Sequence, residues 1–115
     1  MAKRAIIEKV RKYLHILRDN GFPVTSGILY GSYVRGEETP DSDIDVMVLS
    51  PLFDKDHRAR VGQLWSLTRK VDNRIEPVPV GEERFKTDNV SPLLAIARQE
   101  GVMVRIRKKK LEKAG

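Results

Sequence analysis

Two short motifs in this chain could do chemistry together. The first is the pair Gly31-Ser32, and the second, after ten intervening residues, is the alternating pair Asp43-x-Asp45. A glycine–serine turn can offer backbone N–H groups and a hydroxyl to a phosphate, while paired carboxylates can hold a divalent metal ion. These are the parts needed to bind a nucleoside triphosphate.

The two aspartates stand at the start of an apolar segment typical of a strand. Because side chains alternate across a strand, Asp43 and Asp45 should share one face, about 6.6 Å apart. Carboxylates so placed repel each other unless a cation compensates, and Mg²⁺ suits this role because it takes carboxylate, water and phosphate ligands. Glu76, the one acid in the third predicted strand, would complete a site for two metal ions about 4 Å apart. Taken alone, the aspartates also fit solvated acids at a strand start.

The Gly31-Ser32 turn is expected where a strand ends and a short helix begins, so the helix N-terminus would add to its attraction for phosphate. Arg35 is placed to reach the same phosphate. Most Gly-Ser pairs are simple turns, however, and Arg35 could instead form a surface ion pair with Glu37 or Glu38.

Other chemistries find little support in the sequence. A calcium loop would need glycine where Val46 stands and glutamate where Leu52 stands. A Walker-type phosphate loop would need lysine where Glu37 stands. His15 and His57 lie in separate segments without metal-ligand spacing, so they are expected to be surface side chains.

The elements that must position these residues follow from apolar periodicity and from glycine and proline breaks. Helices are predicted over 3–19, 33–37, 55–71 and 91–101, and strands over 24–30, 44–49, 74–80 and 102–106. This alternation predicts an α/β (α+β) domain with a small three- to four-stranded sheet flanked by helices.

Four further expectations concern these elements. Asp54 should cap the 55–71 helix, and Trp65 on its apolar stripe should anchor the core. Pro77 and Pro79 lack N–H donors and should confine the third strand to a sheet edge, with Glu76 in mid-strand.

Length and composition bound the possibilities. The 115 residues, of which 40% are hydrophobic, fit one domain over 1–106 with a basic C-terminal tail over 107–115. No run approaches the roughly 20 apolar residues that span a bilayer, and no secretory signal is evident, so a cytoplasmic protein is expected. The chain has no cysteine, which excludes disulfides and thiolate chemistry.

The net charge of +6 is unevenly distributed. Residues 1–20 carry +4 and residues 104–115 carry +5, whereas residues 21–103 carry −3. Since the centre is acidic and a basic chain end is usually a solvated segment, direct binding of nucleic acid is not expected.

Together, Gly31-Ser32, Arg35-Gly36, Ser42-Asp43 and Asp45, with a later acid on a third strand, resemble the nucleotidyltransferase superfamily that includes DNA polymerase beta. More closely, the chain resembles the minimal nucleotidyltransferases of prokaryotes, over nearly its whole length. The resemblance implies a mixed sheet with Asp43, Asp45 and Glu76 around two Mg²⁺ ions, for which Mn²⁺ can substitute, and ATP as the substrate. Glu76 departs from the superfamily, where this third acid is often aspartate.

The resemblance also implies a mechanism. One metal ion would hold the triphosphate, which Gly31, Ser32 and Arg35 also bind, and the other would lower the pKa of an acceptor hydroxyl. That hydroxyl would attack the α-phosphorus in line and expel pyrophosphate, with Glu76 or a neighbouring carboxylate receiving its proton.

The acceptor is expected to be a protein, because larger relatives bind their acceptors on added domains for which this chain has no room. Minimal nucleotidyltransferases that pair with a HEPN protein imply transfer of AMP to a tyrosine of that RNase toxin, with this chain as the antitoxin. Two alternatives remain open at this stage. One is the same chemistry on another protein or a small molecule, and the other is a catalytically silent nucleotide- or partner-binding module.

Overall fold

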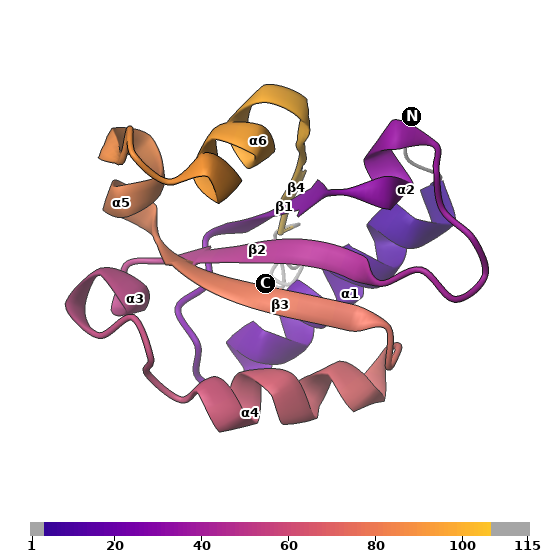
Figure 1. Ribbon diagram of the computed structural model, residues 1–115. Coiled ribbons are helices and arrows are strands. Elements are labelled where there is room, and N and C mark those ends of the chain that lie inside the picture. Colours follow the sequence, from indigo (N-terminus) through magenta and orange to yellow (C-terminus); the bar gives the residue numbers. More distant parts are fainter. Residues whose placement is uncertain (1–3, 107–115) are drawn as a thin grey trace, which may run out of the picture.

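A four-stranded mixed sheet forms the centre of the molecule in the computed structural model, which describes residues 4–106 (Figure 1). The strand order is β3-β2-β1-β4; β1 pairs antiparallel with β2 and β4, and β2 pairs parallel with β3. The strands are β1 Ser26–Tyr30, β2 Ile44–Ser50, β3 Ile75–Gly81 and β4 Val102–Arg105. The predicted basic tail over 107–115 lies outside the described residues.

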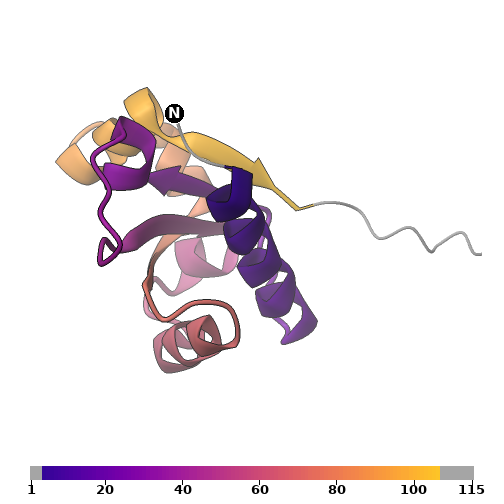
Figure 2. The same ribbon diagram turned by 90° about the vertical axis from the view of Figure 1, so that its right-hand side faces the viewer.

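Helices cover both faces of this sheet. They are α1 Arg4–Asp19, α2 Ser32–Arg35, α3 Leu52–Lys55, α4 Val61–Ser66, the 3₁₀ helix η1 Leu67–Lys70, α5 Glu82–Thr87 and α6 Pro92–Glu100. In Figure 1, α1 and α4 lie below the sheet and α5 and α6 above it. The side view of Figure 2 shows the same layers, with α1 in indigo and α6 in yellow on opposite sides of the strands. Among residues 4–106, no helix has the length and apolar character needed to cross a bilayer.

The face under α1 carries the larger core, and we call it the α1 face. The apolar stripe predicted for the first helix is buried there, and Tyr13 joins it by donating a hydrogen bond from its hydroxyl to the Leu64 carbonyl at 2.7 Å. Strand residues Ile44, Val46 and Val48 meet this stripe from the sheet.

The opposite face lies under α5 and α6, and we call it the α6 face. Its core is smaller and joins the strand residues to two buried side chains of α6, Leu94 and Ala97. The sequence prediction for this helix is confirmed, since the Ser91 hydroxyl accepts a hydrogen bond from the Leu94 N–H at 3.3 Å and Pro92 occupies the first turn.

The single helix predicted over 55–71 is wrong, because the structure breaks this segment into α3, α4 and η1. Asp56 accepts a hydrogen bond from the Arg58 N–H at 3.1 Å, and Arg60 has a left-handed φ of 54°. A side chain that bonds the local backbone competes with the helical ladder, and a left-handed residue ends it. Trp65 is also not a core anchor, since it is 44% exposed.

Asp54 does cap a helix, but a different one. Its carboxylate accepts hydrogen bonds from the backbone N–H groups of Glu83 at 2.9 Å and Arg84 at 3.1 Å, which begin α5. That helix was not predicted at all. The expected edge strand is confirmed, because β3 ends the sheet, but Glu76 is its second residue rather than a mid-strand one.

Candidate active site

The sheet register brings the predicted acids together at one end of the α6 face. Asp45 pairs with Tyr30 on β1 and with Glu76 on β3. Paired residues on adjacent strands project from the same face, so these three side chains form a row across the sheet. Asp43 lies two residues before Asp45, immediately before β2 begins. The structure therefore places all three predicted carboxylates beside one another.

The carboxylates perturb one another as closely spaced like charges do. Burial raises the pKa of Asp45, and the charge of Asp43 raises it further, while Arg35 acts weakly in the other direction. A hydrogen bond shared with Asp43 raises the pKa of Glu76, with burial and the charges of Asp43 and Asp45 adding to it. Ionising the full set is thus unfavourable without a cation nearby.

Tyr30 lies next to the acids and was missed by the sequence analysis. Burial, followed by the charges of Asp45 and Glu76, raises its pKa to about 12. The phenol is therefore neutral at physiological pH and contributes an apolar, uncharged wall to the site. The sequence did carry a signal that Tyr30 lines the site, because Tyr30 directly precedes Gly31. A strand that ends at the proposed phosphate turn also ends beside the acids.

Gly31 packs directly against Asp45. It has φ 86°, and a Cβ at this position would lie 2.3 Å from Asp45 Oδ2. Only glycine combines the left-handed φ with so close an approach. The Gly31 carbonyl also accepts hydrogen bonds from the N–H groups of Val34 at 3.0 Å and Arg35 at 3.1 Å, which begins α2 right at Ser32.

Arg35 is engaged in ion pairs on the rim of the site. Its Nε lies 3.0 Å from Glu37 Oε1, and its Nη1 lies 3.1 Å from Glu100 Oε1 at the end of α6. Of the two partners considered from the sequence, Glu37 is observed. Since the Arg35 side chain is 45% exposed, these pairs are solvent-screened and can exchange for a phosphate.

The donor chemistry at this end of the sheet fits Mg²⁺. Carboxylate oxygens are its preferred protein ligands, and the ion takes few of them because water and phosphate complete its shell. Within residues 4–106, no three His, Cys, Asp or Glu side chains already converge as a closed ligand set. Asp43, Asp45 and Glu76 are thus neighbours whose mutual repulsion a divalent cation would relieve, rather than a preformed cage.

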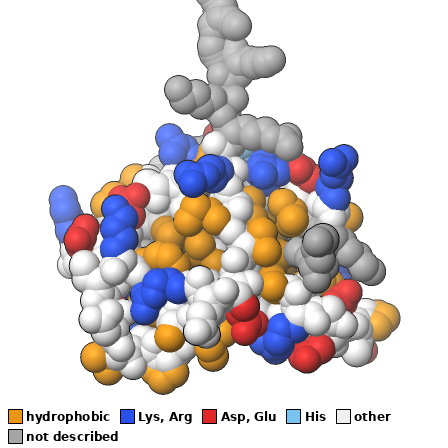
Figure 3. Space-filling view, turned by 90° about the horizontal axis from the view of Figure 1, so that it is seen from above, with side chains coloured by type: hydrophobic (Ala, Val, Ile, Leu, Met, Phe, Trp, Pro, Cys, Tyr) orange, Lys and Arg blue, Asp and Glu red, His pale blue; other side chains and the backbone are white. Residues whose placement is uncertain are grey.

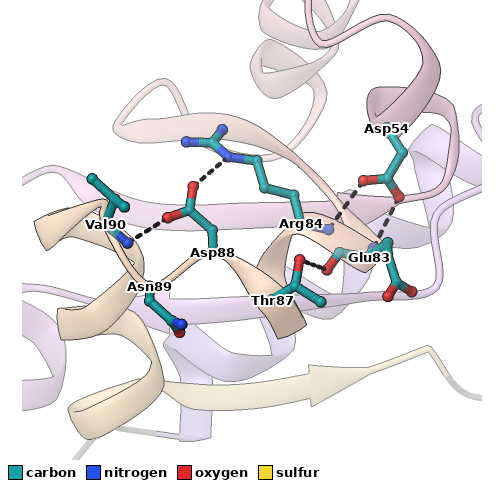
Figure 4. Close-up of a pocket in the computed structure, with 7 residues that line it drawn as sticks. All are labelled: Asp54, Glu83, Arg84, Thr87, Asp88, Asn89 and Val90. Carbon is teal, nitrogen blue, oxygen red and sulfur yellow. Dashed lines mark hydrogen bonds and ion pairs between the residues drawn. The ribbon is translucent and has the colours of Figure 1, made fainter.

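A separate hollow lies at the other end of the parallel strands, between α3 and the segment that follows β3 (Figure 4). Asp54, Arg84 and Asp88 line it, and they bond to one another or to nearby backbone. None of the predicted site residues lines this hollow.

The comparisons with known proteins identify the family and the fold of the chain. The model of the nucleotidyltransferase domain family matches residues 8–109. The chain therefore belongs to this family. The predicted class of enzyme, a nucleotidyltransferase, is confirmed.

One curated relative is 54% identical over 43 residues, which are 37% of this chain and 42% of the relative. It is from Methanocaldococcus jannaschii and bears the name "Putative protein adenylyltransferase". The matched segment therefore spans less than half the length of that relative.

Solved structures confirm the predicted fold. A crystal structure described as "a putative nucleotidyltransferase from Sulfolobus solfataricus" superposes with TM-score 0.60 at 12% identity, covering 91% of this chain and 84% of that one. A toxin-antitoxin structure with AMP-PNP superposes with TM-score 0.57 at 26% identity, covering 89% and 74%. A mutant MntA-HpeT toxin-antitoxin superposes with TM-score 0.56 at 22% identity, covering 84% and 73%.

Proposed function

We propose that this nucleotidyltransferase transfers AMP from ATP to a protein hydroxyl, the acceptor being a tyrosine of a HEPN RNase toxin for which the chain is the antitoxin. Two similarities support the acceptor class. The Methanocaldococcus jannaschii relative bears the name of a protein adenylyltransferase, and one similar structure is a toxin-antitoxin with the ATP analogue AMP-PNP.

The single observation that carries the chemistry is the row Tyr30–Asp45–Glu76 with the Gly31 turn packed against it. The Gly31-Ser32 turn, the proposed phosphate site, thus lies directly beside carboxylates that raise one another's pKa. A nucleoside triphosphate bound with divalent metal would bring positive charge to these carboxylates and a phosphate to the turn.

Each residue then has a role in the proposed reaction. Gly31 and Ser32 hold the phosphates, and Arg35 exchanges its glutamate partners for one of them. Asp43, Asp45 and Glu76 would hold Mg²⁺ or Mn²⁺, which supplies charge stabilisation and lowers the pKa of the acceptor hydroxyl when bound.

The transfer itself forms one bond and breaks one. The acceptor oxygen bonds to the α-phosphorus, the bond from that phosphorus to the bridging oxygen breaks, and pyrophosphate leaves. The acceptor proton passes to Glu76 or a neighbouring carboxylate.

The test is to incubate the protein with ATP labelled at the α-phosphate, Mg²⁺ and a HEPN protein encoded beside it. Label on a HEPN tyrosine, absent when the γ-phosphate carries the label instead, supports the proposal. Asp43→Asn with Asp45→Asn should abolish the label, while Asp41→Asn, an exposed acid in the same loop, should keep it. Undiminished transfer by the double variant would sink the site assignment.

Two other results identify the alternatives. Label on a different protein or on a small molecule indicates the same chemistry with another acceptor. A stable complex with the HEPN protein but no label in any acceptor indicates a silent binding module.

A further inference from the structure

Arg74 joins three segments around the candidate site, and the proposed reaction gives it no role. Its Nη1 donates hydrogen bonds to the Tyr33 hydroxyl at 2.7 Å and to the Pro40 carbonyl at 3.3 Å. Its backbone carbonyl accepts a hydrogen bond from the Ile44 N–H at 2.8 Å. One residue thus contacts α2, the loop after α2 and the start of β2.

Asp72 holds the Arg74 guanidinium in place. Oδ1 accepts from Nε at 3.0 Å and Oδ2 accepts from Nη2 at 2.8 Å, which is the two-pronged geometry that orients an arginine. Lys9 of α1 also donates to Asp72 Oδ2 at 2.6 Å. The Asp72 side chain is only 11% exposed, and its pKa is held well below the usual range, chiefly by its hydrogen bonds from Arg74. The pair is therefore tied to α1 through Lys9.

The segments that Arg74 joins are those that carry the proposed site residues. Tyr33 directly follows Ser32 and is buried. The central carbon of the Arg74 guanidinium lies 5.9 Å from the centroid of the Tyr33 ring. Pro40 belongs to the loop that leads to Asp43, and Arg74 itself stands two residues before Glu76. Their relative placement decides the distance from the phosphate turn to the carboxylates.

We infer that Arg74, oriented by Asp72, is a positioning residue for nucleotidyl transfer that fixes the phosphate turn relative to the carboxylates. This inference rests on the proposed active site, because Arg74 contacts the turn and the loop that carry Ser32 and Asp43. A displacement of the reacting groups by about 1 Å can reduce the rate about 100-fold. A residue that holds the turn in place without touching the reacting groups can therefore change kcat.

The guanidinium shape is essential to this role. Lysine could pair with Asp72 as a point charge, but its single ammonium lacks the planar fork that serves Asp72, Tyr33 and Pro40 at once. Arg74→Lys should therefore behave more like Arg74→Met than like the wild type.

Arg98 offers a matched control. Its guanidinium donates to two backbone carbonyls, of Phe85 at 2.7 Å and Asp88 at 2.8 Å, and lies 5.7 Å from the Phe85 ring centroid. Like Arg74 it donates to backbone carbonyl oxygen and lies near an aromatic ring, but it joins α5 to α6 and not the segments that carry the acids.

The first measurement is hydrogen exchange, which needs no acceptor. Arg74→Met should raise amide exchange at least about 10-fold in peptides covering 31–44, whereas Arg98→Met should leave those peptides unchanged. Unchanged exchange over 31–44 in Arg74→Met overturns the inference, whatever the protein is found to transfer.

The second measurement is the rate of AMP transfer at saturating ATP, with unfolding free energy measured alongside. Arg74→Met should lower kcat about 10- to 100-fold, and Arg98→Met, of comparable stability, should keep kcat within about two-fold. Tyr33→Phe, which removes one hydroxyl and should fold normally, should lower kcat less and add nothing to Arg74→Met in the double variant. Equal losses of kcat in the Arg74 and Arg98 variants overturn the inference.

These readouts separate the inference from the proposed function. If the wild type transfers no AMP, the proposed function fails, and the exchange result alone decides whether Arg74 orders the site. If Asp43→Asn abolishes transfer but Arg74→Met does not change kcat, the proposed function stands and the positioning role is overturned.

Discussion

The two faces of the sheet differ in the side chains they carry. On the α1 face, strand residues such as Ile44 and Val46 are fully buried against the stripe of α1. On the α6 face, a small core around Met47 and Leu94 gives way at one end to Asp45 and Glu76. Seen from above, the α6 side of the molecule shows apolar side chains interspersed with charged ones (Figure 3).

This difference shows which part of the molecule can tolerate closely spaced carboxylates. Like-charged carboxylates with raised pKa values destabilise the native state at neutral pH. The larger core on the other side of the same strands supplies apolar burial that offsets this. We therefore expect substitutions on the α1 face to change stability and substitutions at the acid end of the α6 face to change activity.

The largest effect should come from Asp45→Asn. We expect AMP transfer to fall about 1000-fold, which corresponds to about 4 kcal/mol in the barrier. Unfolding free energy at pH 7 should stay level or rise, because asparagine removes a charge that burial and Asp43 make unfavourable. Since the folded-state pKa lies above the unfolded one, this gain should shrink as the pH falls towards 4. Urea unfolding at both pH values tests this, and a clear loss of stability at pH 7 would break the comparison.

Next in size is Leu14→Ala on the α1 face. Leu14 is completely buried beneath the sheet, so its truncation should lower the unfolding free energy by about 3 kcal/mol. At a temperature where the variant is folded, kcat should match the wild type. A fall in kcat as large as that of Asp45→Asn would show that the two faces are not functionally separate.

Gly31→Ala and Gly36→Ala sharpen the comparison within one turn. Both glycines have positive φ, so alanine should cost about 1–2 kcal/mol of stability at Gly36, which is left-handed, and more at Gly31, whose ψ of −150° lies in a region essentially restricted to glycine. Only at Gly31 would the new Cβ strike Asp45, whereas nothing lies within 4 Å of the position at Gly36. We expect transfer to fall about 100-fold in Gly31→Ala and no more than about three-fold in Gly36→Ala. Equal activities would show that the approach of Gly31 to Asp45 is unimportant.

The smallest effect should come from Asp72→Asn, a carboxylate with the opposite pH dependence from Asp45. Its pKa is lowered by Arg74 and Lys9, so it stabilises the fold when ionised. The variant should lose about 2 kcal/mol at pH 7. In the wild type this contribution should be fully present above the unfolded pKa of about 4 and be lost progressively as the pH falls from there towards the lower folded pKa. Urea unfolding of both proteins between pH 7 and pH 3 checks this, and a constant difference across that range would contradict it.

Local patterns predicted most of the fold correctly. The stripe on α1, the apolar run of β2, the prolines of β3 and the Ser91-Pro92 cap are all signals carried within a few residues. Where a segment lacked a strong local signal, prediction failed. Residues 56–60, of which only Ala59 is apolar, interrupt the helix that was predicted there, and α5 depends on a cap from Asp54, 29 residues before Glu83.

The candidate site divides in the same way. The sequence by itself determined which acids face one way, because side chains alternate along a strand, whereas the close approach of Gly31 to Asp45 came only from the structure. Tertiary structure alone decided that Glu76 pairs with Asp45, that Tyr30 lines the site, and that Arg35 meets Glu100. It also decided that Arg74 reaches Tyr33, 41 residues away in the chain. Such contacts depend on sheet register and packing between distant segments, which no local pattern encodes.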